Sequence, residues 1–414
     1  MDWFHHLVGF SEEGLSCEEI RSQFTSEHVV SECKSHHHQH EPSSSSRPAD
    51  DVYGPIADVV LTSKANGRRM IAGRFEAVSL AQLRERVDVI NSHSRTSTSC
   101  ASTTCNTTST STCSKSSANI NTVRELVGDI RTVLNDPANA GAMVQVASQF
   151  NCLEMIDPTS TPEMGIGVYE KDHTQGPICA MACGAGTIYR NYFVDVKGDI
   201  GQTADRQLDG IARLGAELGN NSPINAPDGS PSGSLWEMQN GYCQATKSGL
   251  ATIRGILQGA TEEEADRLRG LLEVGIQWNA EVTSATSAPS SSTNTTKHPL
   301  CLSQIFCSAL PVAYARRGIA KHEWKDFAAL VLEAAYEATI LAAVINRERT
   351  GCNRLYLTML GGGAFGNTEK WINDSMRRAL EKYRNFGLDI CIVSYGKSNA
   401  YVRQLARLLA NDDD

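Results

Sequence analysis

The stretch that decides the fold is Leu355-Tyr-Leu-Thr-Met-Leu-Gly-Gly-Gly-Ala-Phe-Gly-Asn367. Its first half is a short apolar run, typical of a strand that is buried on both faces of a sheet. Three consecutive glycines follow, and a helix is expected from about Thr368 to Phe386. Glycine lets a backbone come close to a ligand, and N–H groups beside a helix N-terminus attract anions. The stretch therefore predicts a strand, a phosphate-binding loop and a helix, although a tight turn without a ligand would need similar glycines.

Strands and helices alternate along the rest of the chain. Strand patterns occur at Arg69–Phe75, Met143–Ala147, Gln304–Leu310 and Ile390–Tyr395. A helix is predicted to start at residues 79–84, capped by Ser79, and another to start at the capping box formed by Thr261 and Glu264. Further helical patterns occur at residues 123–134, 204–218, 245–257 and 324–346. This alternation predicts an α/β fold in which helices cover both faces of a largely parallel or mixed sheet. Ligands in such sheets bind beyond the carboxyl ends of the strands.

Composition narrows the class of protein. The chain has 414 residues and a formal net charge of -9, so we expect no nucleic-acid partner. We see no apolar run of the roughly 20 residues that a membrane-spanning helix needs, and we expect no membrane partner. The start, Met1–His6, lacks the pattern of a signal peptide. We therefore expect a cytoplasmic or nuclear protein that is not secreted and whose 13 cysteines are reduced.

Two segments differ from the rest in composition. Residues 92–118 are nearly all Ser, Thr and Cys, and residues 281–297 are rich in Ser, Thr and Asn. Neither has enough apolar surface to offset the entropy of ordering, so both are predicted to be disordered inserts. The remaining chain divides into an N-terminal extension that packs on the core, residues 1–91, and a core made of residues 119–280 and 298–414.

A histidine tract, His36-His-His-Gln-His40, is the feature most similar to a metal-binding motif. A polar tract of this kind lacks the second shell of hydrogen bonds that fixes metal ligands in place. We interpret it as a solvated linker and predict neither a metal site nor a cofactor.

A second glycine cluster lies at residues 183–187, shortly before Arg190. We interpret Gly184, Ala185, Gly186 and Thr187 as the opposite wall of a cleft, with Arg190 placed to pair with phosphate oxygens. Two glycine loops suit a diphosphate better than a single phosphate. The P-loop pattern GxxxxGK[ST] and a strand-GxGxxG-helix unit are both missing from the sequence, which argues against a P-loop nucleoside triphosphatase and a Rossmann dinucleotide site.

Three stretches of the chain resemble the macrodomain superfamily. Residues 355–367 and the strand after them resemble the last third of a macrodomain, where the second phosphate loop ends in a Gly-x-Phe/Tyr-Gly element. Val144–Asn151 resembles the family's strand that ends in an asparagine, and Gln304–Tyr314 resembles the strand before its long helix. The resemblance covers roughly residues 143–190 and 304–396 and implies a three-layer α/β/α macrodomain-like core with helical additions.

The resemblance also implies roles for individual residues. Asn151 would face the distal ribose, Gly184–Thr187 would form the first phosphate wall, and Tyr395 would lie near adenine. Phe365 would pack on the ribose, and the second phosphate wall would comprise Gly361, Gly362, Gly363, Ala364, Phe365, Gly366 and Asn367. Gly128-Asp129-Ile130 is similar to an early family motif, but it lies in a helical pattern, so adenine recognition is not assigned to Asp129.

The first half of the chain departs from a common macrodomain. More than thirty residues separate Asn151 from Gly184, where the family has a glycine segment soon after its asparagine. Insertions of this kind look more like the poly(ADP-ribose) glycohydrolase-type branch, or like effector macrodomains that remove ADP-ribose from arginine on ubiquitin. The implied partner is ADP-ribose or an ADP-ribosylated protein, with ubiquitin among the candidates.

Cleavage of an ADP-ribosyl bond passes through an oxocarbenium-like state and calls for a carboxyl group. Glu154 is the first candidate, because it follows Asn151 by three residues; Asp195 and Asp205 are the others. Two of them have a plain alternative: Glu154 as a solvated loop charge and Asp205 as a helix-dipole partner. The sequence thus predicts an enzyme that removes ADP-ribose from protein side chains. The alternatives are a non-catalytic reader of ADP-ribosylated proteins and an interaction scaffold with a degenerate pocket.

Overall fold

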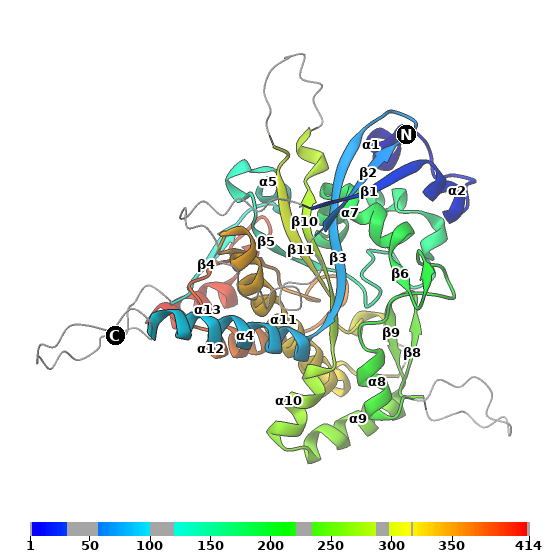
Figure 1. Ribbon diagram of the computed structural model, residues 1–414. Helices are drawn as coiled ribbons and strands as arrows, with labels where there is room; N and C mark the ends of the chain where they lie inside the picture. Colours follow the sequence, from blue (N-terminus) through cyan, green and yellow to red (C-terminus); the bar gives the residue numbers. More distant parts are fainter. Residues whose placement is uncertain are drawn as a thin grey trace, which may run out of the picture.

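A nine-stranded mixed sheet forms the centre of the molecule (Figure 1). The computed structural model describes residues 2–30, 57–99, 120–220, 234–286, 298–315 and 318–411, with the backbone alone for 93–99 and 411. The strands lie in the order β1-β2-β3-β10-β11-β5-β12-β13-β4. Their bounds are β1 Phe24–Val30, β2 Ala57–Ser63, β3 Arg69–Ser79, β4 Thr122–Val127, β5 Met143–Ala147, β10 Glu273–Glu281, β11 Cys301–Cys307, β12 Arg354–Leu357 and β13 Asp389–Ser394. Strands β11, β5, β12, β13 and β4 are mutually parallel.

Helices cover both faces of this sheet. α11 (Lys325–Thr350) packs on one face, and α6 (Gln175–Ala182) and α7 (Gly184–Ile188) pack on the other. Side chains of β11 alternate accordingly, because successive residues of a strand point to opposite faces. Ile305 and Cys307 join the apolar core around α11, and Phe306 joins the core beside α6. The predicted fold class, a three-layer α/β/α protein with a mixed sheet, is confirmed.

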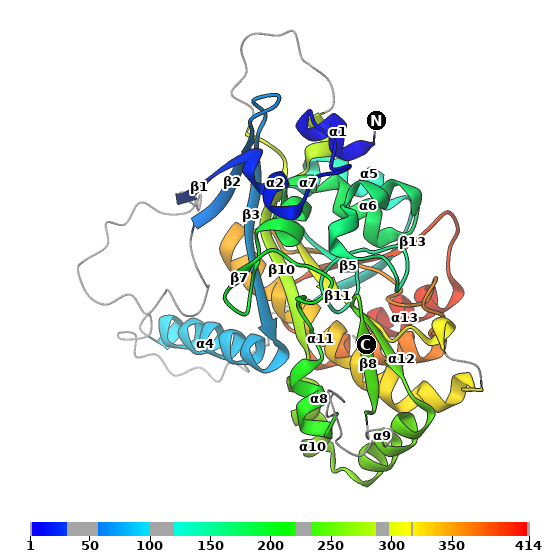
Figure 2. The same ribbon diagram turned by 90° about the vertical axis from the view of Figure 1, so that its right-hand side faces the viewer.

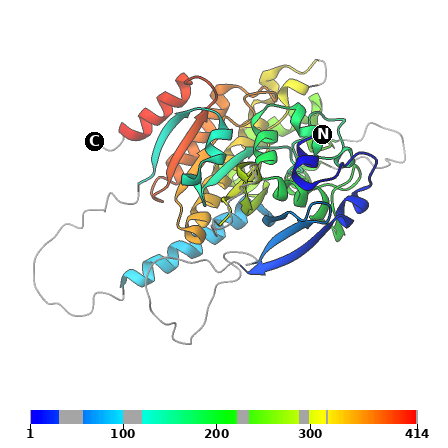
Figure 3. The same cartoon turned by 90° about the horizontal axis from the view of Figure 1, so that it is seen from above.

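Smaller elements surround these layers. In Figure 2, α8, α9 and α10 gather at one end of the molecule. In Figure 3, the N-terminal strands, in blue, lie at one side of the sheet and the red helix α13 lies at the other. The bounds are α1 Trp3–Val8, α2 Cys17–Ser22, α4 Leu80–Ser99, α5 Ile130–Asn135, β6 Asp195–Val196, β7 Asp199–Ile200, α8 Ala212–Leu218, β8 Trp236–Gln239, β9 Tyr242–Ala245, α9 Lys247–Gly259, α10 Glu262–Gly270, α12 Glu369–Lys382 and α13 Ala400–Asn411.

The N-terminal residues add strands to the sheet. β2 pairs with β3, and β3 pairs with β10, so the extension is continuous with the core. The first residues of both predicted inserts belong to regular elements, because α4 continues to Ser99 and β10 to Glu281, with a further helical turn at Thr283–Thr286. Residues 100–118 and 287–297 of these inserts, and the tract His36–His40, lie outside the described residues.

Two helical predictions were wrong. Residues 122–127 form strand β4, and helix α5 starts only after Asp129, whose Oδ1 accepts a hydrogen bond from the N–H of Arg131 at 2.8 Å. Apolar residues on a partly exposed edge strand had the spacing of a helix by coincidence. In the second case α8 begins at Ala212, because Gly210 is engaged elsewhere. Its N–H donates to the carbonyl of Phe150 at 2.9 Å, and its carbonyl accepts from Glu273 at 2.8 Å.

The long helix α11 belongs to the core. Among the described residues, Lys321–Thr350 is the one helical segment long and apolar enough to cross a membrane by length and composition, a feature that the sequence survey did not detect. In the structure 89% of its most apolar window is buried inside the protein. Its apolar character is therefore accounted for by packing against the sheet and the neighbouring helices.

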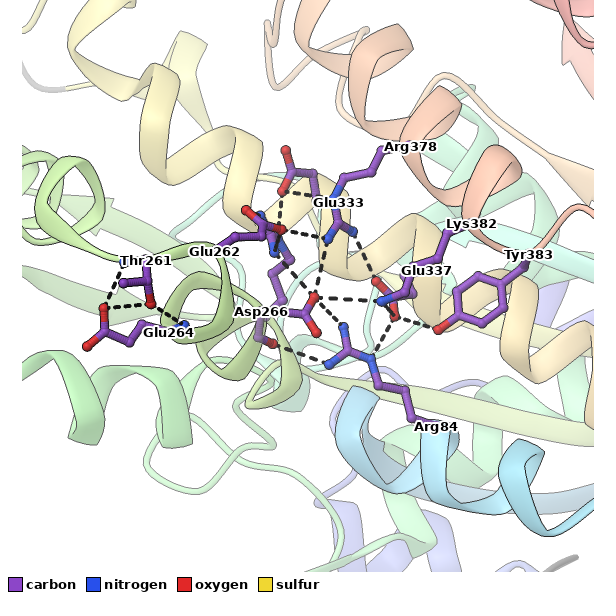
Figure 4. Close-up of polar contacts among 11 residues, drawn as sticks. Arg84, Thr261, Glu262, Glu264, Asp266, Glu333, Glu337, Arg378, Lys382 and Tyr383 are labelled. Atoms are coloured by element: carbon purple, nitrogen blue, oxygen red, sulfur yellow. Dashed lines mark hydrogen bonds and ion pairs between the residues drawn. The ribbon is translucent and has the colours of Figure 1, made fainter.

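A network of ion pairs joins α11 to α4, α10 and α12 (Figure 4). At its centre the carboxylate of Glu337, which is fully buried, accepts hydrogen bonds from Arg84 at 2.7 Å and Lys382 at 2.8 Å. Arg378 and the hydroxyl of Tyr383 also donate to this carboxylate. Burial alone would raise the pKa of Glu337, but these donors outweigh it and lower the pKa to about 2.

We expect Glu337→Gln to destabilise the fold, because the substitution leaves several cations without their shared counter-charge. The free energy of unfolding should fall by about 3 kcal/mol at pH 7, the low end for a buried pair, since the cations are partly exposed. The stabilisation is complete above the unfolded-state pKa of about 4.3 and is lost as pH falls toward 2, so the difference should shrink between pH 5 and pH 3. Urea denaturation measures it. Glu381→Gln, at a half-exposed position on α12, is the matched control, and an equal loss in both variants would contradict the assignment.

Candidate functional site

A cavity of about 180 Å³ lies beyond the carboxyl ends of β5, β11 and β12. Its lining comes from residues 147–149 and 154–156 after β5, from 174–177 at the start of α6, and from 358–361 and 363–365 after β12. Asp172, Tyr242, Ala309 and Tyr314 complete it. The cavity therefore lies at the edge of the sheet where ligands of α/β proteins bind.

The glycine loop after β12 forms one wall. Gly361 has φ +72°, and a Cβ there would lie 2.5 Å from the Cβ of Ala309, so only glycine fits. Asn367 closes the loop: its N–H donates to the carbonyl of Gly361 and its side-chain amide to that of Leu310, both at 2.9 Å. Within the described part of the chain, nothing accepts a hydrogen bond from the N–H groups of residues 363–365. Three backbone donors are therefore available beside the cavity.

The start of α6 forms the facing wall. The side-chain amide of Gln175 bonds to β5, accepting from the N–H of Ala147 at 2.8 Å and donating to the carbonyl of Gln145 at 2.7 Å. A Cβ at Gly176 would lie 2.0 Å from the carbonyl oxygen of Ala147. Glycine at this position thus lets the helix start directly against the strand. Sequence reasoning missed this wall, whose only local signal was the Gly-Pro pair early in a short apolar helix.

Three aromatic rings close one side of the cavity. Tyr242 lies 5.4 Å from Phe365 and 5.4 Å from Tyr314, between ring centroids, and Tyr314 lies 5.9 Å from Phe365. The hydroxyl of Tyr242 donates to the carbonyl of Met155 at 2.8 Å, which ties the ring to the loop after β5. Of these three rings, Phe365 is a predicted site residue, whereas the sequence analysis assigns no role to Tyr242 or Tyr314.

Glu154 is the buried carboxylate of the cavity lining. Its exposed fraction is 1%, its Oε2 lies 3.3 Å from the guanidinium of Arg190, and its backbone N–H donates to the hydroxyl of Tyr169 at 3.1 Å. Burial raises the pKa of Glu154 to about 7, with Arg190 acting in the opposite direction. A carboxyl group with a pKa near neutrality can both donate and accept a proton at physiological pH.

The predicted first phosphate wall was wrong. Gly184, Ala185, Gly186 and Thr187 form helix α7, and all four are buried away from the cavity. A Cβ at Gly184 would lie 2.5 Å from the side chain of Leu7, so this glycine serves close helix packing instead of ligand approach. Glycine clusters for these two purposes have the same appearance in a sequence.

Six other predicted site residues do not line the cavity. Asn151 is fully buried outside the cavity lining, because its side chain bonds to Gln207 and to the N–H of Leu153. Asp195 and Asp205 are exposed and do not line the cavity, which removes them as catalytic candidates. Gly362, Gly366 and Asn367 shape the glycine loop without lining the cavity.

Two residues lie farther along the same edge of the sheet. Tyr395 directly follows β13 and is 76% exposed. Asp129 follows β4, the neighbouring strand, and caps α5. Residues 122–127 form strand β4, so the predicted helix that argued against a role for Asp129 in adenine recognition is not present. The predicted position of Tyr395 near adenine stays a prediction.

A second cavity, of about 940 Å³, is larger. It is lined by α1, α5, the start of β3 and the last part of α6, and it has three arginines, Arg68, Arg69 and Arg131. Each arginine already has a partner within the protein: the carbonyl of Thr283, and the carboxylates of Glu27 and Asp129. The carboxyl ends of the parallel strands do not reach this cavity, so we place the functional site at the smaller one.

Comparison with known proteins finds a partial structural likeness. No family model matches the sequence, and no curated protein matches it. Crystal structures of poly(ADP-ribose) glycohydrolase from Deinococcus radiodurans are similar to parts of the chain. The P21 and P32 forms in complex with ADP-ribose give TM-scores of 0.23 and 0.24, at 12% and 10% identity, and each match covers 34% of this chain and 53% of that chain. The apo form gives a TM-score of 0.22 at 13% identity, covering 32% and 50%.

The chain therefore spans about half the length of the solved proteins that it matches. At these TM-scores the match assigns no residue role and no activity to this chain, and the roles below rest on its own geometry.

We expect Gly361→Ala to lower the free energy of unfolding by about 2 kcal/mol, because a side chain there meets both backbone strain and Ala309. Gly363→Ala is the matched control, since a Cβ at Gly363 has nothing within 4 Å. Its cost should stay within about 0.5 kcal/mol. Urea denaturation of both variants checks the loop geometry, and equal costs would mean that the loop has another conformation.

Proposed function

We propose that this protein is an ADP-ribosyl hydrolase that removes ADP-ribose from modified protein side chains. One observation carries the proposal: the buried Glu154 lines a cavity between the start of α6 and the glycine loop, and within the described residues nothing accepts a hydrogen bond from the N–H groups of residues 363–365 of that loop. The macrodomain-like motifs of the sequence support ADP-ribose as the ligand. Ubiquitin stays among the candidate targets, and the substrate class is an ADP-ribosylated protein.

The walls suit a diphosphate. Among the described residues that line the cavity there is no Lys or Arg, so an anion there would depend on neutral donors, namely backbone N–H groups and the hydroxyl and amide side chains of the lining. Residues 363–365 line one side of the cavity with N–H groups that have no acceptor among the described residues, and the start of α6 adds the N–H groups of Gln175 and Gly176, since Pro177 has none, with the positive end of a short helix dipole. Two sets of donors on opposite walls match two phosphate groups better than one.

The size of the cavity sets which part of the ligand it encloses. About 180 Å³ is less than the roughly 300 Å³ at the lower end for drug-sized ligands. We infer that it holds the distal ribose and the diphosphate, with Phe365 and Tyr242 against the sugar. The adenine end would then lie outside the cavity along the sheet edge, on the side of Tyr395.

Glu154 would handle the proton in bond cleavage. The leaving group of an ADP-ribosyl bond departs as the ribose takes on oxocarbenium character, and a carboxyl group must protonate it or activate water. A carboxyl with a pKa of about 7 is protonated in a large fraction of molecules at neutral pH, which is the state of a general acid. Burial in the cavity lining is therefore what makes Glu154 suited to this chemistry.

We expect the full chain to release ADP-ribose from an ADP-ribosylated protein. Glu154→Gln should lower kcat by about 100-fold or more, the usual worth of a general acid or base, while calorimetry shows nearly unchanged affinity for ADP-ribose. Asp195→Asn and Asp205→Asn are matched controls at exposed carboxylates and should retain activity. Binding of ADP-ribose by the wild-type protein without turnover would instead make it a reader, and wild-type kinetics in Glu154→Gln would remove Glu154 from the mechanism.

A further inference from the structure

The motif Gly184-Ala-Gly-Thr187-Ile-Tyr-Arg190 has no place in the cavity, yet it supports the site from behind. Its glycines let α7 pack closely on neighbouring elements: a Cβ at Gly186 would lie 3.1 Å from the side chain of Gln277 on β10. This close packing places Thr187 and Arg190, one turn apart, beneath the turn that carries Glu154.

The guanidinium of Arg190 is held through Nε and one terminal nitrogen, while the other terminal nitrogen, Nη1, is buried without a hydrogen-bond partner among the described residues. The side chain is fully buried, and its carbon Cζ lies 3.7 Å from the ring centroid of Phe306 on β11. Nε donates to the carbonyl of Cys152 at 3.0 Å, and one terminal nitrogen donates to the hydroxyl of Thr187 and to Oε2 of Glu154, both at 3.3 Å. One side chain thus holds both the backbone and the carboxylate of the 152–154 turn.

The two oxygens of Glu154 have different surroundings. Oε2 is held by Arg190, whereas Oε1 is buried and has no hydrogen-bond partner among the described residues. Cys152, with φ +61°, gives the turn a conformation that a side chain rarely adopts, so the turn depends on contacts that hold it. The hydrogen bond from Nε of Arg190 to the carbonyl of Cys152 is one such contact.

We propose that Arg190 is a positioning residue that fixes the 152–154 turn and binds Oε2 of Glu154, so that Oε1 is the oxygen presented to the ligand. This inference rests on the proposed function, in which the cavity holds the ligand that Oε1 would contact. Lysine does not replace arginine here, because a single ammonium group cannot reproduce the planar fork that reaches Cys152 and Glu154 together.

The charge of Arg190 also sets when Glu154 ionises. The other titratable groups near Glu154 are the thiols of Cys152 and Cys179 and the hydroxyl of Tyr169, whose pKa values burial raises, so they stay neutral at pH 7. Asp172 lines the cavity as a further carboxylate. Arg190 is the cation that favours ionised Glu154 within the described part of the chain. Without it, burial alone would determine the pKa of this carboxyl.

The test is a ¹³C NMR titration of the glutamate carboxyl groups in the full chain, with the Glu154 signal identified by its absence in Glu154→Gln. Arg190→Met should raise the midpoint of Glu154 by about one pH unit or more, because an opposite charge in contact has been removed. Arg190→Lys should raise it less. The matched control is Arg269→Met, which removes another buried arginine, one that pairs with Glu262 and Glu333. It should leave the midpoint unchanged.

Hydrolysis measured as a function of pH gives the second readout. Arg190→Lys should lower kcat about tenfold or more with little change in KM, and Thr187→Val should do the same more weakly. An unchanged midpoint in folded Arg190→Met would overturn the proposal. If that variant does not fold, wild-type kcat in both Arg190→Lys and Thr187→Val would overturn it. Because the NMR titration needs no turnover, a shifted midpoint in a protein without hydrolase activity would count against the proposed function alone.

Discussion

The parallel pairing of β5 with β12 and β11 is the constraint on which the site depends. Met143 pairs with Leu355, and Gln145 with Ile305, so the three strands end at the same edge of the sheet. The loop after β5 carries Glu154, and the loop after β12 carries the glycines. Neither loop is near the other in sequence, and only this register brings them to one cavity. Helix α11 secures the register from one face, since Thr339 accepts a hydrogen bond from the side chain of Gln145 at 2.9 Å.

Two buried glutamates show how the surroundings decide the role of the same side chain. Glu337 is contacted by two arginines, a lysine and a tyrosine, which hold its pKa at about 2. It therefore stays charged and links the helices through ion pairs. Glu154 has a single arginine, so burial prevails and its pKa is about 7. The first carboxylate serves the fold, while the second has, among the described residues, one oxygen without a hydrogen-bond partner and a pKa that favours proton exchange near neutral pH. This contrast makes Glu154, and not Glu337, the candidate for the proposed chemistry.

Local patterns in the sequence predicted the parts of the fold that depend on local forces. The run at 355–367 was predicted as strand and loop because a short apolar run favours a buried strand and consecutive glycines favour a loop. The capping box at Thr261 was confirmed because it also depends on residues close together in sequence. Glu154 was found from its spacing to Asn151. The facing wall was not predictable, because Gln175 acts by bonding to β5, 28 residues earlier in the chain. The cluster at 184–187 was misread, since glycine that admits a helix and glycine that admits a phosphate look alike in sequence.

The central claim is that one cavity, between the start of α6 and the glycine loop, holds a diphosphate with its distal ribose at Glu154. A crystal structure of the full chain with ADP-ribose tests it most directly. The account predicts phosphate oxygens within hydrogen-bond distance of the N–H groups of residues 363–365 and of the start of α6, and a ribose oxygen beside Oε1 of Glu154. ADP-ribose bound instead in the larger cavity near Arg68 and Arg131, with the smaller one empty, would contradict it.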